Sequence, residues 1–275
     1  MSGSSERLEF RQRCRVKPES ALLREYAANA TSQWGEDGII RRIFELIRLE
    51  NRFCVEFGAW DGKRFSNTWQ LLDRCGWRGV LIEGDPARFA ELQVNYPAGG
   101  RATLINRYVG LGEDSLDDLL AATDCSREPD LVSIDVDGLD WHIWQSVTNY
   151  QPRVVVVEFN PSIPNDVLFV QASDARLNHG CSLLALVELG KQKGYELAAT
   201  TPCNALFVEQ SLFPRLGIAD NDIDSMHCPG AYESRIFQLY DGTLALAGCQ
   251  RLLWLDRDIG REEIQVLSSQ QRRYG

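Results

Sequence analysis

Short apolar runs alternate with amphipathic stretches along the middle of the chain, and this alternation restricts the fold more than any other feature. The clearest run is 154–158, where four valines stand in succession before a glutamate. A strand that is apolar on both faces is typical of a parallel sheet covered by helices on both sides. Similar runs predict further strands at 53–57, 80–82, 102–105, 131–134, 195–199 and 205–208. We therefore expect a doubly wound α/β fold.

Amphipathic stretches between these runs predict the helices. Isoleucines and a phenylalanine between Ile39 and Ile47 form one apolar stripe, so a helix is expected from Glu36. Asp85 followed by proline predicts a capped helix start. A helix that Ser66 or Asn67 caps is predicted to run to Cys75. The other predicted helices are at 21–28 (in part), 115–122, 139–147 and 182–193.

Three parts of the chain differ in pattern. Residues 1–31 are expected to form an N-terminal, partly helical arm, and 32–208 to form the α/β domain. Residues 209–275 break the alternation and are expected to be a C-terminal extension, with a hairpin or edge pair at 242–255. The pattern leaves open whether this extension covers a ligand or forms an oligomer contact.

Charge and composition exclude some classes of protein. The chain has 275 residues, 29 Lys and Arg against 39 Asp and Glu, and a net charge of −10, which argues against a nucleic-acid-binding protein. No apolar run approaches the roughly 18 residues of a membrane span, and the polar N-terminus does not resemble a signal peptide, so we expect a cytoplasmic protein. None of the eight cysteines forms a C-x-x-C pair, and free buried thiols are expected.

A glycine-containing segment follows the first predicted strand. It reads E-x-G-x-x-x-G, from Glu56 through Gly58 to Gly62. The fingerprint of a dinucleotide dehydrogenase, G-x-G-x-x-G, is absent because Trp60 stands at its second glycine. Glycines at a strand end let a cofactor approach the backbone closely. A plain strand-to-helix turn is the alternative interpretation.

An acidic residue, Glu83, follows the second predicted strand. A carboxylate at this position can accept hydrogen bonds from both hydroxyl groups of a ribose. Glu83 and the glycine segment together favour a cofactor that contains adenosine but no pyrophosphate. This combination resembles the class I S-adenosylmethionine-dependent methyltransferases.

The resemblance narrows when five segments are read in order. SQWGED, VEFGAWDG, LDDL, SIDVDG and VEFN, between residues 32 and 160, resemble the FkbM-type methyltransferases. The resemblance covers about 32–208. It implies a Rossmann-like, mostly parallel seven-stranded sheet, S-adenosyl-L-methionine as cofactor, and O-methylation of a sugar, glycan or secondary metabolite. Asp137 departs from the usual family pattern, which has glutamate at that position.

The cofactor-binding residues expected from the strand ends and the resemblance come from five segments. They are Gln33, Glu56, Gly58, Ala59, Trp60, Gly62, Asn67, Glu83, Gly84 and Asp135. Trp60 lies inside the glycine segment, where its ring is placed to stack on an adenine or a sulfonium.

Acids at the ends of the fourth and fifth strands are the candidates for catalysis. Asp135, Asp137, Glu158 and Asn160 would converge if these strands are neighbours, as the resemblance implies. An all-oxygen set suits Mg²⁺, whereas a carboxylate without a metal can act as a general base. Capping of the following helices is the third interpretation, and it is the one we favour for Asp140. His142 is a further candidate base, although a packed histidine fits its apolar helix as well.

The predicted partner is a small-molecule or glycan acceptor, and a homodimer is left open. A non-catalytic cofactor-binding subunit and methylation at nitrogen or carbon are the alternatives to O-methylation. A nicotinamide-dependent oxidoreductase is disfavoured by the missing glycine fingerprint.

Overall fold

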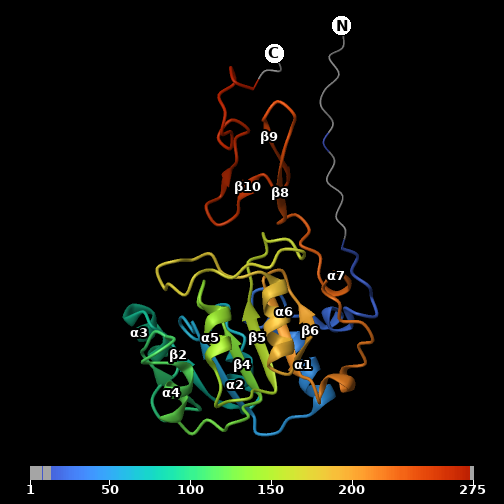
Figure 1. The fold of residues 1–275 in the computed structure, drawn as a ribbon. Coiled ribbons are helices and arrows are strands. Elements are labelled where there is room, and N and C mark those ends of the chain that lie inside the picture. Colours follow the sequence, from blue (N-terminus) through green and yellow to red (C-terminus); the bar gives the residue numbers. More distant parts are fainter. Residues whose placement is uncertain (1–7, 9–13, 273–275) are drawn as a thin grey trace.

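The computed structural model describes residue 8 and residues 14–272 and is built around one seven-stranded sheet (Figure 1). The strand order is β3-β2-β1-β4-β5-β7-β6. Neighbouring strands are parallel except at β7, which runs antiparallel to both β5 and β6. The predicted doubly wound, mostly parallel fold is therefore confirmed. The strands are β1 (Phe53–Phe57), β2 (Arg78–Ile82), β3 (Ala102–Ile105), β4 (Leu131–Ile134), β5 (Val154–Glu158), β6 (Tyr195–Thr200) and β7 (Asn204–Glu209).

Helices cover the sheet, with α5 and α6 packed together on the face turned to the viewer in Figure 1. The four valines of β5 are fully buried, as the sequence predicts for a strand covered on both faces. The helices are α1 (Glu36–Ile47), α2 (Trp69–Arg74), α3 (Pro86–Asn95), α4 (Leu116–Ala121), α5 (Asp140–Ser146), α6 (Leu183–Gln192) and α7 (Ile223–Met226), with 3-10 turns η1 (Leu22–Tyr26) and η2 (Phe213–Leu216).

Helix starts follow the local chemistry of the sequence. The Asp85 carboxylate accepts hydrogen bonds from the backbone N–H groups of Ala87 and Arg88, which confirms the predicted cap of α3. The predicted cap of α2 at Ser66 or Asn67 is wrong, since the N-cap position is Thr68 and α2 begins at Trp69. Residues 66–68 instead turn their polar groups toward a buried carboxylate, which is described below.

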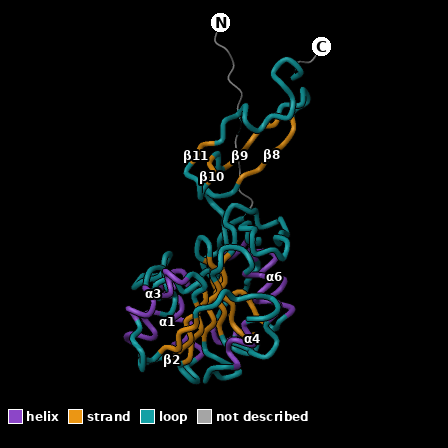
Figure 2. The backbone as a smooth tube through the Cα atoms, turned by 90° about the vertical axis from the view of Figure 1, so that its left-hand side faces the viewer, coloured by secondary structure: helices purple, strands orange, loops and turns teal. Residues whose placement is uncertain are grey.

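The C-terminal arm, defined here as residues 234–272, consists of two antiparallel strand pairs. β8 (Ser234–Gln238) pairs with β9 (Leu244–Gly248), and β10 (Arg251–Leu252) pairs with β11 (Arg257–Asp258). Figures 1 and 2 show the arm extending away from the central sheet. The predicted pairing within 242–255 is wrong, because β9 and β10 each pair with a strand outside that range.

The expectation of free cysteines throughout is also corrected. Cys14 and Cys228 form a disulfide with their Cα atoms 5.4 Å apart. Backbone hydrogen bonds from Arg15 and Lys17 to the carbonyl groups of Asp224 and Ser225 hold the N-terminal segment against α7. A sequence separation of 214 residues hid this pair from local pattern analysis.

The remaining six cysteines are free, and two of them, Cys54 and Cys181, are buried. Within the described residues, no helix combines the length and apolar character needed to cross a membrane.

Candidate functional site

A cavity of about 560 Å³ opens where β1, β2, β4 and β5 end at their carboxyl ends, and we call it the strand-end cavity. This is the edge at which open α/β sheets bind ligands. Nine predicted cofactor-binding residues line it, which are Gln33, Glu56, Gly58, Ala59, Trp60, Asn67, Glu83, Gly84 and Asp135. The tenth, Gly62, lies outside the lining.

The glycine segment after β1 turns sharply and brings the backbone to the cavity wall. Gly58 has a φ of +71°, and a Cβ atom there would lie 1.6 Å from the carbonyl oxygen of Asp135. Gly62 also has a positive φ, but a Cβ there would meet Leu92 of α3 and Tyr96, the residue that follows α3. The missing Cβ of Gly58 therefore lets the segments after β1 and β4 approach each other, whereas that of Gly62 lets α3 pack closely against the glycine segment.

Trp60, between these glycines, has an unusual backbone conformation for its size. Its φ is +51°, a region that costs a bulky residue energy unless its surroundings hold it. Its backbone N–H donates to the Glu83 carboxylate at 2.7 Å. The guanidinium groups of Arg64 and Arg88 lie 5.1 and 4.5 Å from the centre of its ring.

The Glu83 side chain is fixed in place at the end of β2. One carboxylate oxygen accepts from the backbone of Trp60 and the other from that of Asp85, at 2.7 and 2.8 Å. Each oxygen keeps a lone pair for a further donor. A rigid carboxylate with two accepting sites therefore borders the cavity.

The Glu56 side chain is buried below the cavity, and the turn before α2 satisfies it. It accepts hydrogen bonds from the hydroxyls of Ser66 and Thr68 and from the backbone N–H of Asn67, at 2.6–2.7 Å. Burial raises the pKa of Glu56, and these donors oppose the rise. Asn67 donates its amide to Ser133, yet its buried Oδ1 has no donor among the described residues. An acceptor of this kind in a cavity wall requires a ligand donor or water.

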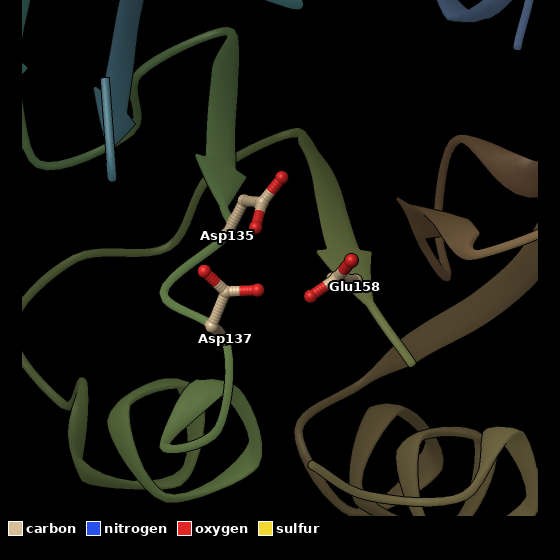
Figure 3. A group of neighbouring side chains, drawn as sticks. All are labelled: Asp135, Asp137 and Glu158. Atoms are coloured by element: carbon tan, nitrogen blue, oxygen red, sulfur yellow. The ribbon is translucent and has the colours of Figure 1, made fainter. Parts of the chain in front are cut away.

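Three carboxylates converge at the ends of the neighbouring strands β4 and β5 (Figure 3). Asp135, Asp137 and Glu158 each place an oxygen within 4.8 Å of the other two. Burial and the repulsion between neighbouring carboxylates raise the pKa of Asp135 to about 8 and that of Glu158 to about 10. Asp137 is exposed and has a positive φ of 56°. The group can therefore retain protons at neutral pH or hold a cation.

Asp140 shapes the loop that carries these carboxylates. It is buried and accepts from the backbone N–H groups of Val136 and Gly138 at 2.9 and 2.8 Å. The helix-capping role predicted for it is wrong, because Asp140 is the first residue of α5 and its carboxylate binds the loop before the helix, while the N-cap position is Leu139. Burial raises the pKa of Asp140 to about 6, although both hydrogen bonds oppose the rise.

Two further predicted residues have hydrogen-bond partners of their own. The Asn160 amide donates to the His179 carbonyl and accepts from Ser162, within its own loop. His142 donates through Nε2 to the Gln171 carbonyl at 2.8 Å. Asn160 lines the second cavity described next, together with Asp137 and Glu158, whereas His142 lines neither cavity.

A second cavity, of about 720 Å³, lies between the loop after β5 and the C-terminal arm, and we call it the arm cleft. It shares Asp137, Glu158 and Trp254 with the strand-end cavity, so the two cavities meet at the carboxylates. Sequence patterns missed Trp254, because no local signal connects the arm to the sheet edge.

The SQWGED segment holds Gln33 at the cavity wall. The Asp37 carboxylate accepts from three successive backbone N–H groups at residues 30–32, at 2.8–2.9 Å. The fully buried Glu36 accepts from the hydroxyl of Thr201. The two acids therefore fix this segment, and neither needs a ligand to explain its presence.

Comparisons with known proteins give matches at the level of solved structures. No family model and no curated protein sequence matches the chain. The N-terminal domain of EvdMO1 with SAH bound is 13% identical over 63% of this chain and 80% of that one, with a TM-score of 0.42. An O-methyltransferase family protein from Burkholderia thailandensis is 12% identical over 63% of this chain and 57% of that one, with a TM-score of 0.41.

A third structure is the precorrin-6y C5,15-methyltransferase from Geobacter metallireducens. It is 16% identical over 66% of this chain and 92% of that one, with a TM-score of 0.38. Independently of these matches, the sheet has the seven strands and the mostly parallel order that the sequence resemblance to class I methyltransferases implies.

Proposed function

We propose that this protein is an S-adenosylmethionine-dependent methyltransferase that methylates a hydroxyl group of a small molecule, sugar or glycan. One observation carries the proposal. The strand-end cavity is lined by the glycine turn after β1, by the hydrogen-bonded Glu83 carboxylate and by the three converging carboxylates, all at one edge of the sheet. Segments 55–62, 133–138 and 157–160, on which the resemblance to FkbM-type enzymes rests, contribute to this edge.

The lining of the strand-end cavity fits S-adenosylmethionine. Glu83 would accept the two ribose hydroxyls, and the unpaired Oδ1 of Asn67 would accept from the ammonium group of the methionine part. Gly58 lets the cofactor approach the backbone. A volume of about 560 Å³ is within the usual range of ligand sites. When bound, the cofactor supplies a methyl group on a positively charged sulfur.

The carboxylates provide the chemistry that a hydroxyl acceptor needs. Asp137 is the exposed member at the junction of the two cavities, and we assign it to accept the hydroxyl proton. Asp135 and Glu158 lie behind it with raised pKa values, and we assign them to hold a proton and orient Asp137. The same oxygens would suit Mg²⁺, which would lower the pKa of the acceptor hydroxyl.

Calorimetric titration with S-adenosylhomocysteine tests the donor site without an acceptor. We expect micromolar binding to the wild-type protein and at least about tenfold weaker binding to Glu83→Gln, since a neutral amide loses charge-assisted hydrogen bonds to the ribose. Glu45→Gln is the matched control, because this exposed residue of α1 lies outside the cavity lining. It should bind like the wild type.

Two outcomes would contradict the proposal or part of it. Absence of binding to folded wild-type protein contradicts the donor site, and equal binding by Glu83→Gln contradicts the role of Glu83. Repeating the titration with Mg²⁺ tests the cation. Tighter binding in Mg²⁺ would support a cation at the three carboxylates, and loss of that effect in Asp135→Asn would locate it there.

A further inference from the structure

The arm cleft has two walls of different character. The loop after β5 contributes polar side chains, among them Asn160, Ser162 and His179. The C-terminal arm contributes the opposite wall, which includes the apolar side chains of Ile236, Leu246, Leu252, Leu253, Trp254 and Ile259. A molecule lying in the cleft therefore meets hydrogen-bonding groups on one side and an apolar surface on the other.

The apolar wall keeps several large side chains open to solvent. Trp254 is 68% exposed, Ile236 59% and Leu252 42%. Exposed apolar side chains that gather in a concave site, rather than lying scattered, mark a binding surface. Their position in a cleft that continues into the strand-end cavity favours a ligand of the same reaction over an unrelated partner.

The charges of the cleft restrict the ligand further. Arg251 is paired with Asp256 and Asp258 within the arm, so its charge is largely compensated. Asp137, Asp140 and Glu158 line the opposite end. An anionic ligand would meet acids without a compensating free cation from Arg251, so an uncharged ligand fits better than an anionic one.

We propose that the arm cleft binds the methyl acceptor, that the acceptor is an uncharged hydroxylated ring bearing an apolar group, and that Trp254 determines this specificity. The inference rests on the proposed methyltransferase function. The ring hydroxyl lies at Asp137, and the apolar group lies on the arm against Leu252 and Trp254. Because Trp254 also borders the strand-end cavity, it sets how close the acceptor comes to the donor.

A series of alkyl β-D-glucosides tests the proposal on the full chain. Methyl, hexyl and octyl glucoside, kept below micelle concentrations, are titrated into protein saturated with S-adenosylhomocysteine. Each buried methylene group strengthens binding, so affinity should rise about two- to fourfold per methylene. Octyl glucoside has seven more methylene groups than methyl glucoside, so it should bind at least about a hundredfold more tightly if all of them are buried.

Two variants of the arm test whether the dependence of affinity on alkyl chain length comes from the arm cleft. Trp254→Ala should reduce the affinity for octyl glucoside at least about fivefold and weaken the dependence on chain length. Tyr240→Ala removes a fully exposed aromatic ring from the same arm, outside the cleft lining, and should leave glucoside binding unchanged. Because Trp254 also lines the strand-end cavity, thermal unfolding followed by circular dichroism shows that each variant is folded.

Each result has a separate meaning. If wild-type protein binds S-adenosylhomocysteine but shows no dependence on chain length, the acceptor proposal fails and the donor site stands. If Trp254→Ala binds octyl glucoside like the wild type, or Tyr240→Ala loses it, the apolar group binds elsewhere on the arm and the proposal is overturned. If wild-type protein does not bind S-adenosylhomocysteine, the methyltransferase function itself fails.

Discussion

At the residue scale, the site depends on backbone conformations that most side chains avoid. Gly58, Trp60 and Asp137 all have positive φ angles, and all three line the strand-end cavity. Gly58 is the most constrained, because its missing Cβ makes room for the carbonyl group of Asp135. Gly58 thus packs against the segment after β4 and also lines the proposed donor site.

Substitution of Gly58 by alanine tests this double role. We expect a loss of about 3 kcal/mol or more in the free energy of unfolding, from the left-handed backbone and from the overlap with Asp135. Gly99→Ala is the control, since Gly99 also has a positive φ but open space around it, and it should cost about 1 kcal/mol. Urea denaturation measures both values. Equal losses would show that the close approach at Gly58 is unimportant.

At the scale of elements, the adjacent ends of β4 and β5 bring like charges together. Asp135 and Glu158 have folded-state pKa values raised to about 8 and 10, well above the value of about 4 for an unfolded carboxyl. The folded state therefore binds more protons than the unfolded state between about pH 4 and pH 8. Through these two groups, stability falls as the pH rises across that window.

Asp135→Asn should remove much of this pH dependence. We expect the variant to gain roughly 1 kcal/mol relative to the wild type on going from pH 5 to pH 8, because the amide removes the repulsion at Glu158. Asp73→Asn, at an exposed aspartate outside the site, should show no such gain. The measured quantity is the difference in free energy of unfolding at the two pH values. An unchanged difference for Asp135→Asn would contradict the raised pKa.

The sequence predicted the sheet well because buried parallel strands are apolar and short. Val154–Glu158 and Phe53–Phe57 were predicted with their observed bounds. The prediction failed where distant residues decide the structure. Helix α2 begins only at Trp69 because Ser66 and Asn67, in the turn before it, donate hydrogen bonds to the Glu56 carboxylate. The disulfide between Cys14 and Cys228 joins residues 214 positions apart in the sequence.

The candidate site also contains some residues that the sequence predicts and others that it does not. Residues that directly follow strands, such as Glu83 and Asp135, were predictable because the carboxyl ends of parallel strands meet at one edge. The hydrogen-bond partners of the other side chains were not predictable, and Asn160 and His142 bind the carbonyl groups of His179 and Gln171. Trp254 reaches the site through the position of the arm, which local sequence patterns do not encode.

At the scale of the whole molecule, the proposed donor site lies at the sheet edge and the proposed acceptor site lies against the C-terminal arm. The sheet holds the strand-end cavity, and the arm completes the arm cleft, with the carboxylates where the two meet. The arm stands away from the sheet in both views of the backbone (Figures 1 and 2). The proposed acceptor site therefore has the arm as one wall, whereas the proposed donor site is formed by loops at the strand ends of the sheet.

We propose that the strand-end cavity binds S-adenosylmethionine in one orientation, and a crystal structure with S-adenosylhomocysteine would reveal that orientation. We expect the ribose hydroxyls on the Glu83 carboxylate, the ammonium group within hydrogen-bonding distance of Asn67 Oδ1, and the sulfur facing Asp137. Electron density for the ligand elsewhere, or a reversed orientation with the ribose at Asp137, would contradict it.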